Sequence, residues 1–282
     1  MYIKEYFYEV GTELVEDHYQ LLADREEYMV NQYLDKFENR LSGLDLDGKV
    51  AVLYVGGISV QQGEDRNYDG NFTCSQPIRS SGVVIKNLQS YNMHKYIGVM
   101  PCRDRVVYAN VNSNTCASSM YAVYEAQGLL DRGVVDHVVV IAEEKTSFNT
   151  IRIFKEHRIA VTPGEGFACV VLGREGLYEV KDAKWAYCYD RNPFLVKADG
   201  YAMVATEADV VKGHKTGTDQ NDKAEAEVFG NTIGYKDKVG HCQGASGLIE
   251  TCMLLDDETV QGDVLCVASG LGGFYGSFVV SK

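Results

Sequence analysis

Short apolar runs and longer amphipathic segments alternate along the chain, and the two kinds differ in length as strands and helices do. Five runs of strand length end at glycine or at polar residues: 1–11, 49–57, 106–111, 134–144 and 164–173. The unbroken apolar centre of 134–144 is typical of an interior parallel strand. The charged segment 13–41 carries apolar residues at helical spacing, which predicts one or two helices.

The second half of the chain continues this alternation. We expect strands at 178–180 and 184–189 as an antiparallel extension, helices at 222–229 and 245–255, and two strands around a glycine-rich turn in 263–282. Residues 60–80 are polar and rich in turn formers, which predicts a loop. Because strands alternate with helices, the pattern favours an α/β fold.

Composition narrows the class of protein. A chain of 282 residues with 45% hydrophobic content can bury a large core in one or two domains. The formal net charge of -13 argues against a nucleic-acid partner, because binding phosphates non-specifically requires excess Lys and Arg. No apolar run approaches the ~18 residues of a membrane span, and no secretory leader precedes the first strand.

The eight cysteines are scattered, with no CxxC pair and no close cluster of Cys and His. We therefore expect no metal site and interpret most of the cysteines as reduced core residues of a cytoplasmic protein.

One cysteine, Cys116, stands where the strand at 106–111 gives way to small residues and a helical pattern. A residue at the N-terminus of a helix faces unpaired backbone N–H groups and the positive end of the helix dipole, which favour a thiolate over a thiol. Cys116 is therefore a candidate nucleophile. On the local pattern alone, a buried structural cysteine is the alternative.

Three further segments place histidine or glycine in loops. GHKTGTDQNDKAEAE (213–227) holds His214 before two threonines and a helix that begins with carboxylates. In KDKVGHCQGASGLIE (236–250), His241 precedes small residues that let a helix approach another backbone closely. The turn SGLGGFYGS (269–277) presents backbone N–H groups that can form half of an oxyanion hole. Each segment alone also fits a structural role.

Taken in order, these segments resemble the β-ketoacyl-acyl carrier protein synthases, the condensing enzymes of the thiolase superfamily. SNTCASSM (113–120) is similar to the family's active-site cysteine segment, AEEKTS (142–147) to the segment after the next strand, and GEGFACVVL (164–172) to its glycine-entered strand. The three loop segments are similar to the two histidine segments and the C-terminal turn. The family's spacing of functional residues is reproduced by His214, Asp222, Glu225, Lys236, His241 and Glu250.

The resemblance implies a Cys-His-His ketosynthase of the elongating, decarboxylating type. Cys116 would take an acyl group from an acyl carrier protein or coenzyme A thioester, and His214 and His241 would donate hydrogen bonds to the malonyl thioester carbonyl as it loses carbon dioxide. The backbone N–H groups of Cys116 and Leu271 would hold the oxyanion, an arrangement worth roughly 3 kcal/mol per donor in other enzymes.

The resemblance also assigns supporting roles. Lys236 and Glu225 would form a buried pair that orders the site, while Thr216 and Thr218 would bind the phosphopantetheine arm of the donor. It implies no tightly bound cofactor, because that arm is carried by the substrate.

Several departures leave a second reading open. The chain is shorter than a usual ketosynthase, Ser269 and Leu271 stand where the family has paired phenylalanines, and Lys215 replaces a glycine. A non-condensing member of the fold is therefore the alternative, either an acyltransferase or hydrolase that uses Cys116, or a structural partner that resembles a chain-length factor.

The implied architecture is the layered αβαβα thiolase fold with two similar halves, 1–173 carrying the cysteine and 174–282 carrying both histidines. The strand at 106–111 would pair across the two-fold axis of a homodimer or of a ketosynthase-like heterodimer. Docking of an acidic carrier protein would need a local basic patch, for which the candidates are Lys212, Lys215, Lys223 and Lys236, the last expected to be buried.

Overall fold

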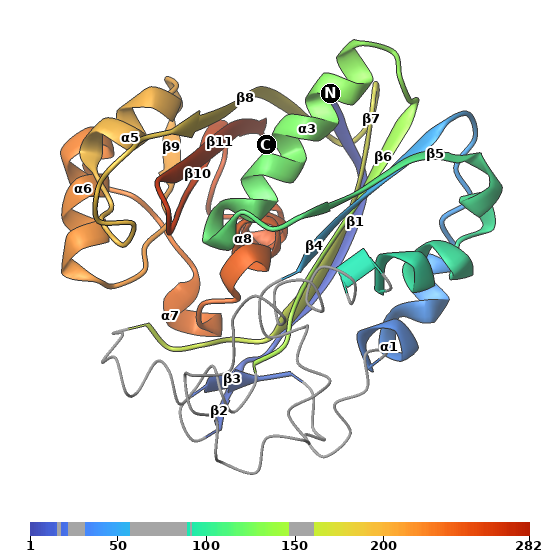
Figure 1. Cartoon of the computed structure of the whole chain (residues 1–282), viewed down its shortest axis with the longest axis horizontal. Coiled ribbons are helices and arrows are strands. Elements are labelled where there is room, and N and C mark those ends of the chain that lie inside the picture. Colours follow the sequence, from blue (N-terminus) through green and yellow to red (C-terminus); the bar gives the residue numbers. More distant parts are fainter. Residues whose placement is uncertain (16–17, 22–31, 57–88, 91, 147–160) are drawn as a thin grey trace.

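The computed structural model describes residues 1–15, 18–21, 32–56, 89–90, 92–146 and 161–282 (Figure 1). The loop expected at 60–80 lies outside the described residues.

A single nine-stranded sheet runs through the described part of the chain (Figure 1). Its strands lie in the order β5-β4-β6-β7-β1-β8-β11-β10-β9. The first five in this order come from the N-terminal part of the chain: β1 (Tyr2–Val10), β4 (Val50–Gly56), β5 (Val106–Asn112), β6 (His137–Glu144) and β7 (Gly166–Gly173). The other four come from the C-terminal part: β8 (Tyr178–Tyr187), β9 (Val210–Lys212), β10 (Asp263–Gly270) and β11 (Phe274–Ser281).

The strand order repeats within this sheet. In the first part β4 and β6 are parallel, and β7 is antiparallel to both β6 and β1. In the second part β9 and β10 are parallel, and β11 is antiparallel to both β10 and β8. The order β4-β6-β7-β1 therefore recurs as β9-β10-β11-β8, and the two parts meet where Tyr2 and Ile3 pair with β8. A boundary after residue 173 stays a prediction.

Helices cover and separate the two parts of the sheet, which gives the predicted αβαβα layers (Figure 1). Helices α3 (Ser118–Asp131) and α8 (Ser246–Asp256) lie between the parts and share one large core with both. Helix α1 (Gln32–Leu41) covers the outer face of the first part, while α5 (Ala198–Val204) and α6 (Asp219–Phe229) cover that of the second.

The alternating geometry of a strand explains why β4 is apolar at every position. Its residues Ala51, Leu53 and Val55 face the central helices, whereas Val50, Val52 and Tyr54 face the cluster around α1. A strand covered on both faces has no polar side, so its sequence shows a continuous apolar run.

Three predicted elements differ from the structure. The segment 13–41 was expected to hold one or two helices; it begins instead with two short antiparallel strands, β2 (Glu13–Val15) and β3 (His18–Gln20), while α1 (Gln32–Leu41) lies at its end. Backbone bonds of Tyr19 with Pro163 and Glu165 hold β3. Strand β8 is continuous where two strands were expected, with Asp182 at φ 53° beside an irregularity in its register with β11. Strand β6 is parallel to β4 on one side only and antiparallel to β7 on the other.

The strands expected at 1–11, 49–57, 106–111 and 164–173, the helices near 222–229 and 245–255, and the closing pair of strands are all present. Helix α5, strand β9 and the single helical turn α7 (Lys236–Val239) were not foreseen, because such short elements carry little periodic signal.

Of the seven described cysteines none forms a disulfide, and five are buried, as expected of core residues. None of the described helices is long and apolar enough to cross a membrane.

Candidate active site

Cys116 lies in a tight turn, Thr115–Ala117, that joins the end of β5 to the start of α3. The turn opens with Thr115 in the left-handed region at φ 53°. An equivalent turn, Gln243–Ala245, precedes α8 and opens with Gln243 at φ 41°. The sequence segments that precede the two central helices therefore adopt the same local shape.

The two helices approach closely at these turns, as the small residues predicted. Ser119 Oγ donates a hydrogen bond to the carbonyl of Gly244 at 2.5 Å. A Cβ atom at Gly247 would lie 3.0 Å from Ser119 Cβ and 2.5 Å from the end of Met120. A larger residue there would require Met120 and Ser119 to shift, so the small residue permits the close approach that accompanies the position of His241, just before the second turn, next to Cys116.

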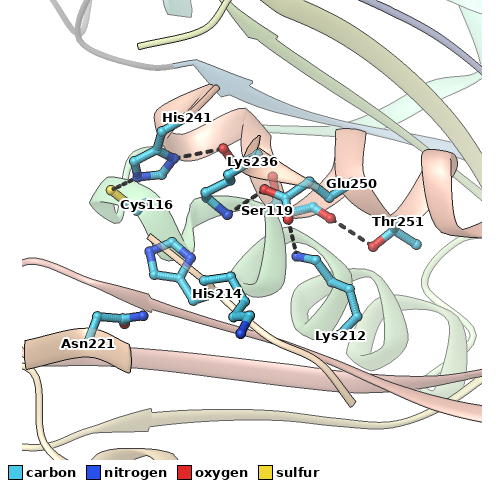
Figure 2. A network of polar contacts seen from close by, with 12 residues as sticks. Cys116, Ser119, Lys212, His214, Asn221, Lys236, His241, Glu250 and Thr251 are labelled. Carbon is cyan, nitrogen blue, oxygen red and sulfur yellow. Dashed lines mark hydrogen bonds and ion pairs between the residues drawn. The ribbon is translucent and has the colours of Figure 1, made fainter. Parts of the chain in front are cut away.

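The thiol of Cys116 faces His241 directly (Figure 2). The Sγ atom lies 3.2 Å from His241 Nε2, and His241 Nδ1 lies 2.9 Å from Ser246 Oγ. Because the hydroxyl of Ser246 can donate or accept, it is compatible with a proton on either nitrogen of His241. This is the arrangement of a nucleophile, a base and a group that orients the base.

His214 completes the group from the other part of the sheet. It follows β9 through Gly213, and its ring lies 5.3 Å from that of His241, centroid to centroid, at 78°. His214 is only 3% exposed, and its Nδ1 atom has no hydrogen-bond partner. The structure therefore brings together Cys116, His214 and His241, the three residues that the sequence analysis placed at the centre of the site.

Burial favours the neutral form of all three groups. It raises the pKa of the Cys116 thiol to about 11, although the positive charge of Lys236 opposes this. Burial also lowers the pKa of His214 and of His241 well below the ordinary value, and Lys236 and Lys212 lower it further. The effect of burial on the thiol pKa is thus opposite to the effect expected of the helix N-terminus, which favours a thiolate.

Lys236 pairs with Glu250 and not with Glu225, so the expected pair is wrong (Figure 2). Lys236 Nζ bonds one carboxylate oxygen of Glu250, and Lys212 Nζ lies 2.8 Å from the other. All three side chains are almost fully buried. Helix α8 carries Glu250 one turn after Ser246, whose hydroxyl lies against His241, so the ion cluster lies next to the histidines.

Glu225 instead holds the loop that carries His214. Its Oε2 atom accepts from the backbone N–H of His214 at 2.9 Å and of Lys215 at 3.0 Å, and its Oε1 atom accepts from Thr232 Oγ1 at 2.8 Å. Asn221 Nδ2 adds a donor at 3.3 Å. Glu225 is thus a positioning residue that fixes the backbone beside the imidazole.

The residues expected to bind the substrate arm and the oxyanion lie around this centre. Thr216 and Thr218 are partly exposed, and their hydroxyls are 2.8 Å apart. Leu271 is 44% exposed in the turn between β10 and β11, and its carbonyl accepts a bond from Thr115 Oγ1 at 3.2 Å. The glycine-rich turn therefore touches the turn that carries Cys116, as a shared oxyanion site requires.

The donor atoms of Cys116, His214 and His241 lie within 4.8 Å of one another and so could also hold a metal ion. Lys236 and Lys212 carry positive charge next to them, which disfavours a divalent cation. The basic patch does not form as proposed, because Lys212 is as fully buried as Lys236; Lys215 and Lys223 are exposed.

Two residues of the site were missed by the sequence analysis. Ser246 was read only as a small residue, and Lys212 as a surface charge. Lys212 ends strand β9, which the sequence did not predict, so its burial carried no signal in the sequence.

Comparisons with known proteins agree with this geometry. No protein-family model matches the chain, and no curated protein matches it. Among solved structures, the ketosynthase from module 6 of the bacillaene synthase from Bacillus subtilis 168 superposes with a TM-score of 0.64 at 14% identity, over 91% of this chain and 59% of that one. The chain thus spans less than two thirds of the length of that protein.

Two complexes are also similar. The type II polyketide ketosynthase bound to its acyl carrier protein, AntDE:AntF, gives a TM-score of 0.67 at 16% identity, over 94% of this chain and 87% of that one. A chain of the complex between the ketosynthase ApeO and its chain length factor ApeC, from Xenorhabdus doucetiae, gives a TM-score of 0.67 at 15% identity, over 99% of this chain and 97% of that one. The strand order, the central helices and these superpositions together identify the chain as a shortened protein with the thiolase fold of the ketosynthases.

Proposed function

We propose that this protein is a ketosynthase-like acyltransferase that condenses an acyl group on Cys116 with a malonyl thioester, with loss of carbon dioxide. The observation that carries the proposal is the position of Cys116 Sγ 3.2 Å from His241 Nε2, beside the unpartnered Nδ1 of His214. A buried polar atom without a partner is costly in a merely structural role.

In the first step the Cys116 thiol passes its proton to His241 Nε2 as the sulfur attacks the acyl thioester. The carbon–sulfur bond to the carrier breaks, and the carrier thiolate leaves with that proton. The backbone N–H groups of Cys116 and Leu271 would hold the oxygen of the tetrahedral intermediate. The positive charge of Lys236 lowers the pKa of the Cys116 thiol, against the effect of burial, and so favours the transient thiolate.

In the second step the malonyl thioester binds with its carbonyl oxygen between the two imidazoles. The bond to the carboxylate breaks, carbon dioxide leaves, and the electron pair forms an enolate that the N–H groups of His214 and His241 stabilise. Neutral imidazoles suit this role, because each keeps one N–H to donate. The carbanion then attacks the acyl carbon, and Cys116 leaves as a thiolate that recovers a proton.

Thr216 and Thr218 would bind the phosphopantetheine arm, whose thioester comes from an acyl carrier protein or coenzyme A. Exposed Lys215, which directly precedes Thr216, would add charge for its phosphate. The proposed reaction belongs to fatty-acid or polyketide synthesis and requires no tightly bound cofactor. Reduced cysteines are in keeping with a cytoplasmic location.

Strand β5 is at the edge of the sheet, and Val107 on it is 58% exposed. An edge strand of this kind suits pairing with a second copy or with a ketosynthase-like partner. Light scattering on the purified protein tests this assembly, with Val107→Lys expected to weaken it.

Intact-protein mass spectrometry tests the function. The protein is incubated with a panel of acyl-carrier-protein and acyl-coenzyme A thioesters, then with a malonyl thioester. We expect a gain of one acyl group that Cys116→Ala abolishes and that the control Cys188→Ala, at the other partly exposed described cysteine, retains. His214→Ala should still accept the acyl group but should not release an elongated product. If no thioester acylates the protein, condensation by this chain alone is excluded.

The second candidate is a non-condensing protein of the same fold, either a cysteine acyltransferase or hydrolase or a partner that resembles a chain-length factor. It is favoured by Ser269 and Leu271 in place of the paired phenylalanines, one of which covers the cysteine in ketosynthases. Ser269 is held in a buried network with Tyr201 and Asn221 and so cannot act as that cover. Acylation without elongation would select this candidate.

A further inference from the structure

Lys212 is a second buried lysine at the site, beyond the set of residues that the proposed chemistry uses. It ends β9, two residues before His214, and its side chain is 0% exposed (Figure 2). Lysine is rarely buried so completely unless it is paired, so this position calls for an explanation.

The ion cluster contains two lysines and one carboxylate. Lys212 Nζ lies 2.8 Å from Glu250 Oε2, while Lys236 Nζ bonds Glu250 Oε1. With both lysines protonated, two positive charges against one negative charge leave this cluster one positive unit in a region from which water is excluded. Burial lowers the pKa of Lys236, and the charge of Glu250 raises it. One lysine would be enough to neutralise the charge of Glu250.

The other charged groups nearby do not cancel this charge at the histidines. Glu225 lies against Gly213, the next residue along β9, and its two oxygens are occupied by four donors. Glu144 acts on Cys116, where it opposes Lys236. Lys236 and Lys212 are the charged groups that act on His241, and both disfavour its protonation.

We propose that Lys212 is a positioning residue that makes the Glu250–Lys236 pair net positive and so gives the Cys116 site a preference for reagents and substrates with a negative charge next to the reacting carbon. Such a charge, held in a buried region, attracts anions far more strongly than a surface lysine does. It also favours each step in which negative charge gathers on sulfur or oxygen.

Two alkylating reagents of nearly equal size test this inference. Iodoacetate carries a carboxylate next to its reacting carbon, and iodoacetamide carries a neutral amide in the same place. Both react with the same thiolate, so the ratio of their rates at Cys116 cancels the thiol pKa and reports the local potential. Peptide mass spectrometry resolves Cys116 from the other cysteines.

We expect Lys212→Met to lower the iodoacetate-to-iodoacetamide ratio by roughly fivefold or more, the size of effect that one nearby buried charge produces. Lys212→Arg keeps the charge and should restore most of the ratio. Lys223→Met removes a lysine whose side chain is 82% exposed and should leave the ratio unchanged.

An unchanged ratio in Lys212→Met would overturn the proposal, and so would an equal fall in Lys212→Arg, because packing and not charge would then be the cause. If Lys212→Met does not fold, the wild-type protein still decides: its ratio at Cys116 must exceed that of an unstructured cysteine peptide in the same tube. An equal or lower ratio refutes the proposal.

The inference depends on the proposed function only where it says that the charge of Lys212 helps the condensation. Alkylation needs no acyl substrate, so the ratio can support the role of Lys212 even if no thioester acylates the protein, and acylation can succeed where the ratio does not change.

Discussion

Replacing Glu225 should loosen the loop that carries His214 while leaving the nucleophile in place. The carboxylate is 1% exposed and accepts four hydrogen bonds, two of them from the backbone N–H groups of His214 and Lys215. In Glu225→Ala these donors lose their common partner inside the protein. Leaving a buried donor unsatisfied costs about 1–3 kcal/mol, and water entering the space left by the side chain recovers part of that.

We expect Glu225→Ala to lower the free energy of unfolding by about 3–4 kcal/mol, a large share of the ~5–15 kcal/mol of a typical domain. Glu225→Gln keeps an oxygen for the two backbone donors and turns an amide toward Thr232, whose hydroxyl can accept. Its cost should be about 1 kcal/mol, because mainly the charge is lost.

Urea unfolding followed by circular dichroism measures both values, with Glu227→Ala, an exposed residue of the same helix, as the control. The acylation assay then separates the two functions, since loss of order at His214 should reduce elongation more than acyl transfer to Cys116. Equal and small costs for Ala and Gln, below about 1 kcal/mol, would refute the role assigned to Glu225.

Three further results are expected. The rate of Cys116 alkylation by iodoacetamide should rise about tenfold per pH unit from pH 7 to 9, because burial raises the thiol pKa to about 11; a plateau below pH 8.5 would contradict this. Ser246→Ala removes the bond to His241 Nδ1 and should slow acylation roughly tenfold, with Ser246→Thr, which keeps the hydroxyl, close to wild type. Burial raises the pKa of Glu143 to about 7, against hydrogen bonds from Tyr54 and Tyr96. The folded state then holds this proton more tightly than the unfolded state, so stability falls as pH rises from about 4.5 to 7; Glu143→Gln should remove up to about 3 kcal/mol of that fall, measured by urea unfolding at several pH values.

The strands of the first part of the sheet were predictable because their sequences are long, apolar and closed by glycine. The hairpin at 13–20 was not, since bonds to Pro163 and Glu165, far along the chain, fix its shape. Two strands were predicted within 178–189, but the structure has one. Pairing with β11 on both sides of the irregularity at Asp182 keeps β8 continuous, and this partner lies far along the chain.

Within the site, the sequence identified the groups but not all of their partners. Cys116, His214 and His241 were named from their segments, and the structure brings them together. The resemblance paired Glu225 with Lys236. In the structure the carboxylate of Glu225, on α6, accepts instead from the backbone of the loop that carries His214. Lys236, on α7, pairs instead with Glu250 on α8.

The sequence by itself determined the α/β class, most of the strands, and which cysteine and histidines are the candidates for the chemistry, because these depend on local periodicity and on segments of a few residues. Tertiary structure alone decided that burial raises the pKa of the Cys116 thiol, that Ser246 bonds His241, and that two buried lysines share Glu250. Charges and hydrogen bonds depend on distance and on exclusion of water, and both are set only when α3 and α8 close on each other between the two parts of the sheet.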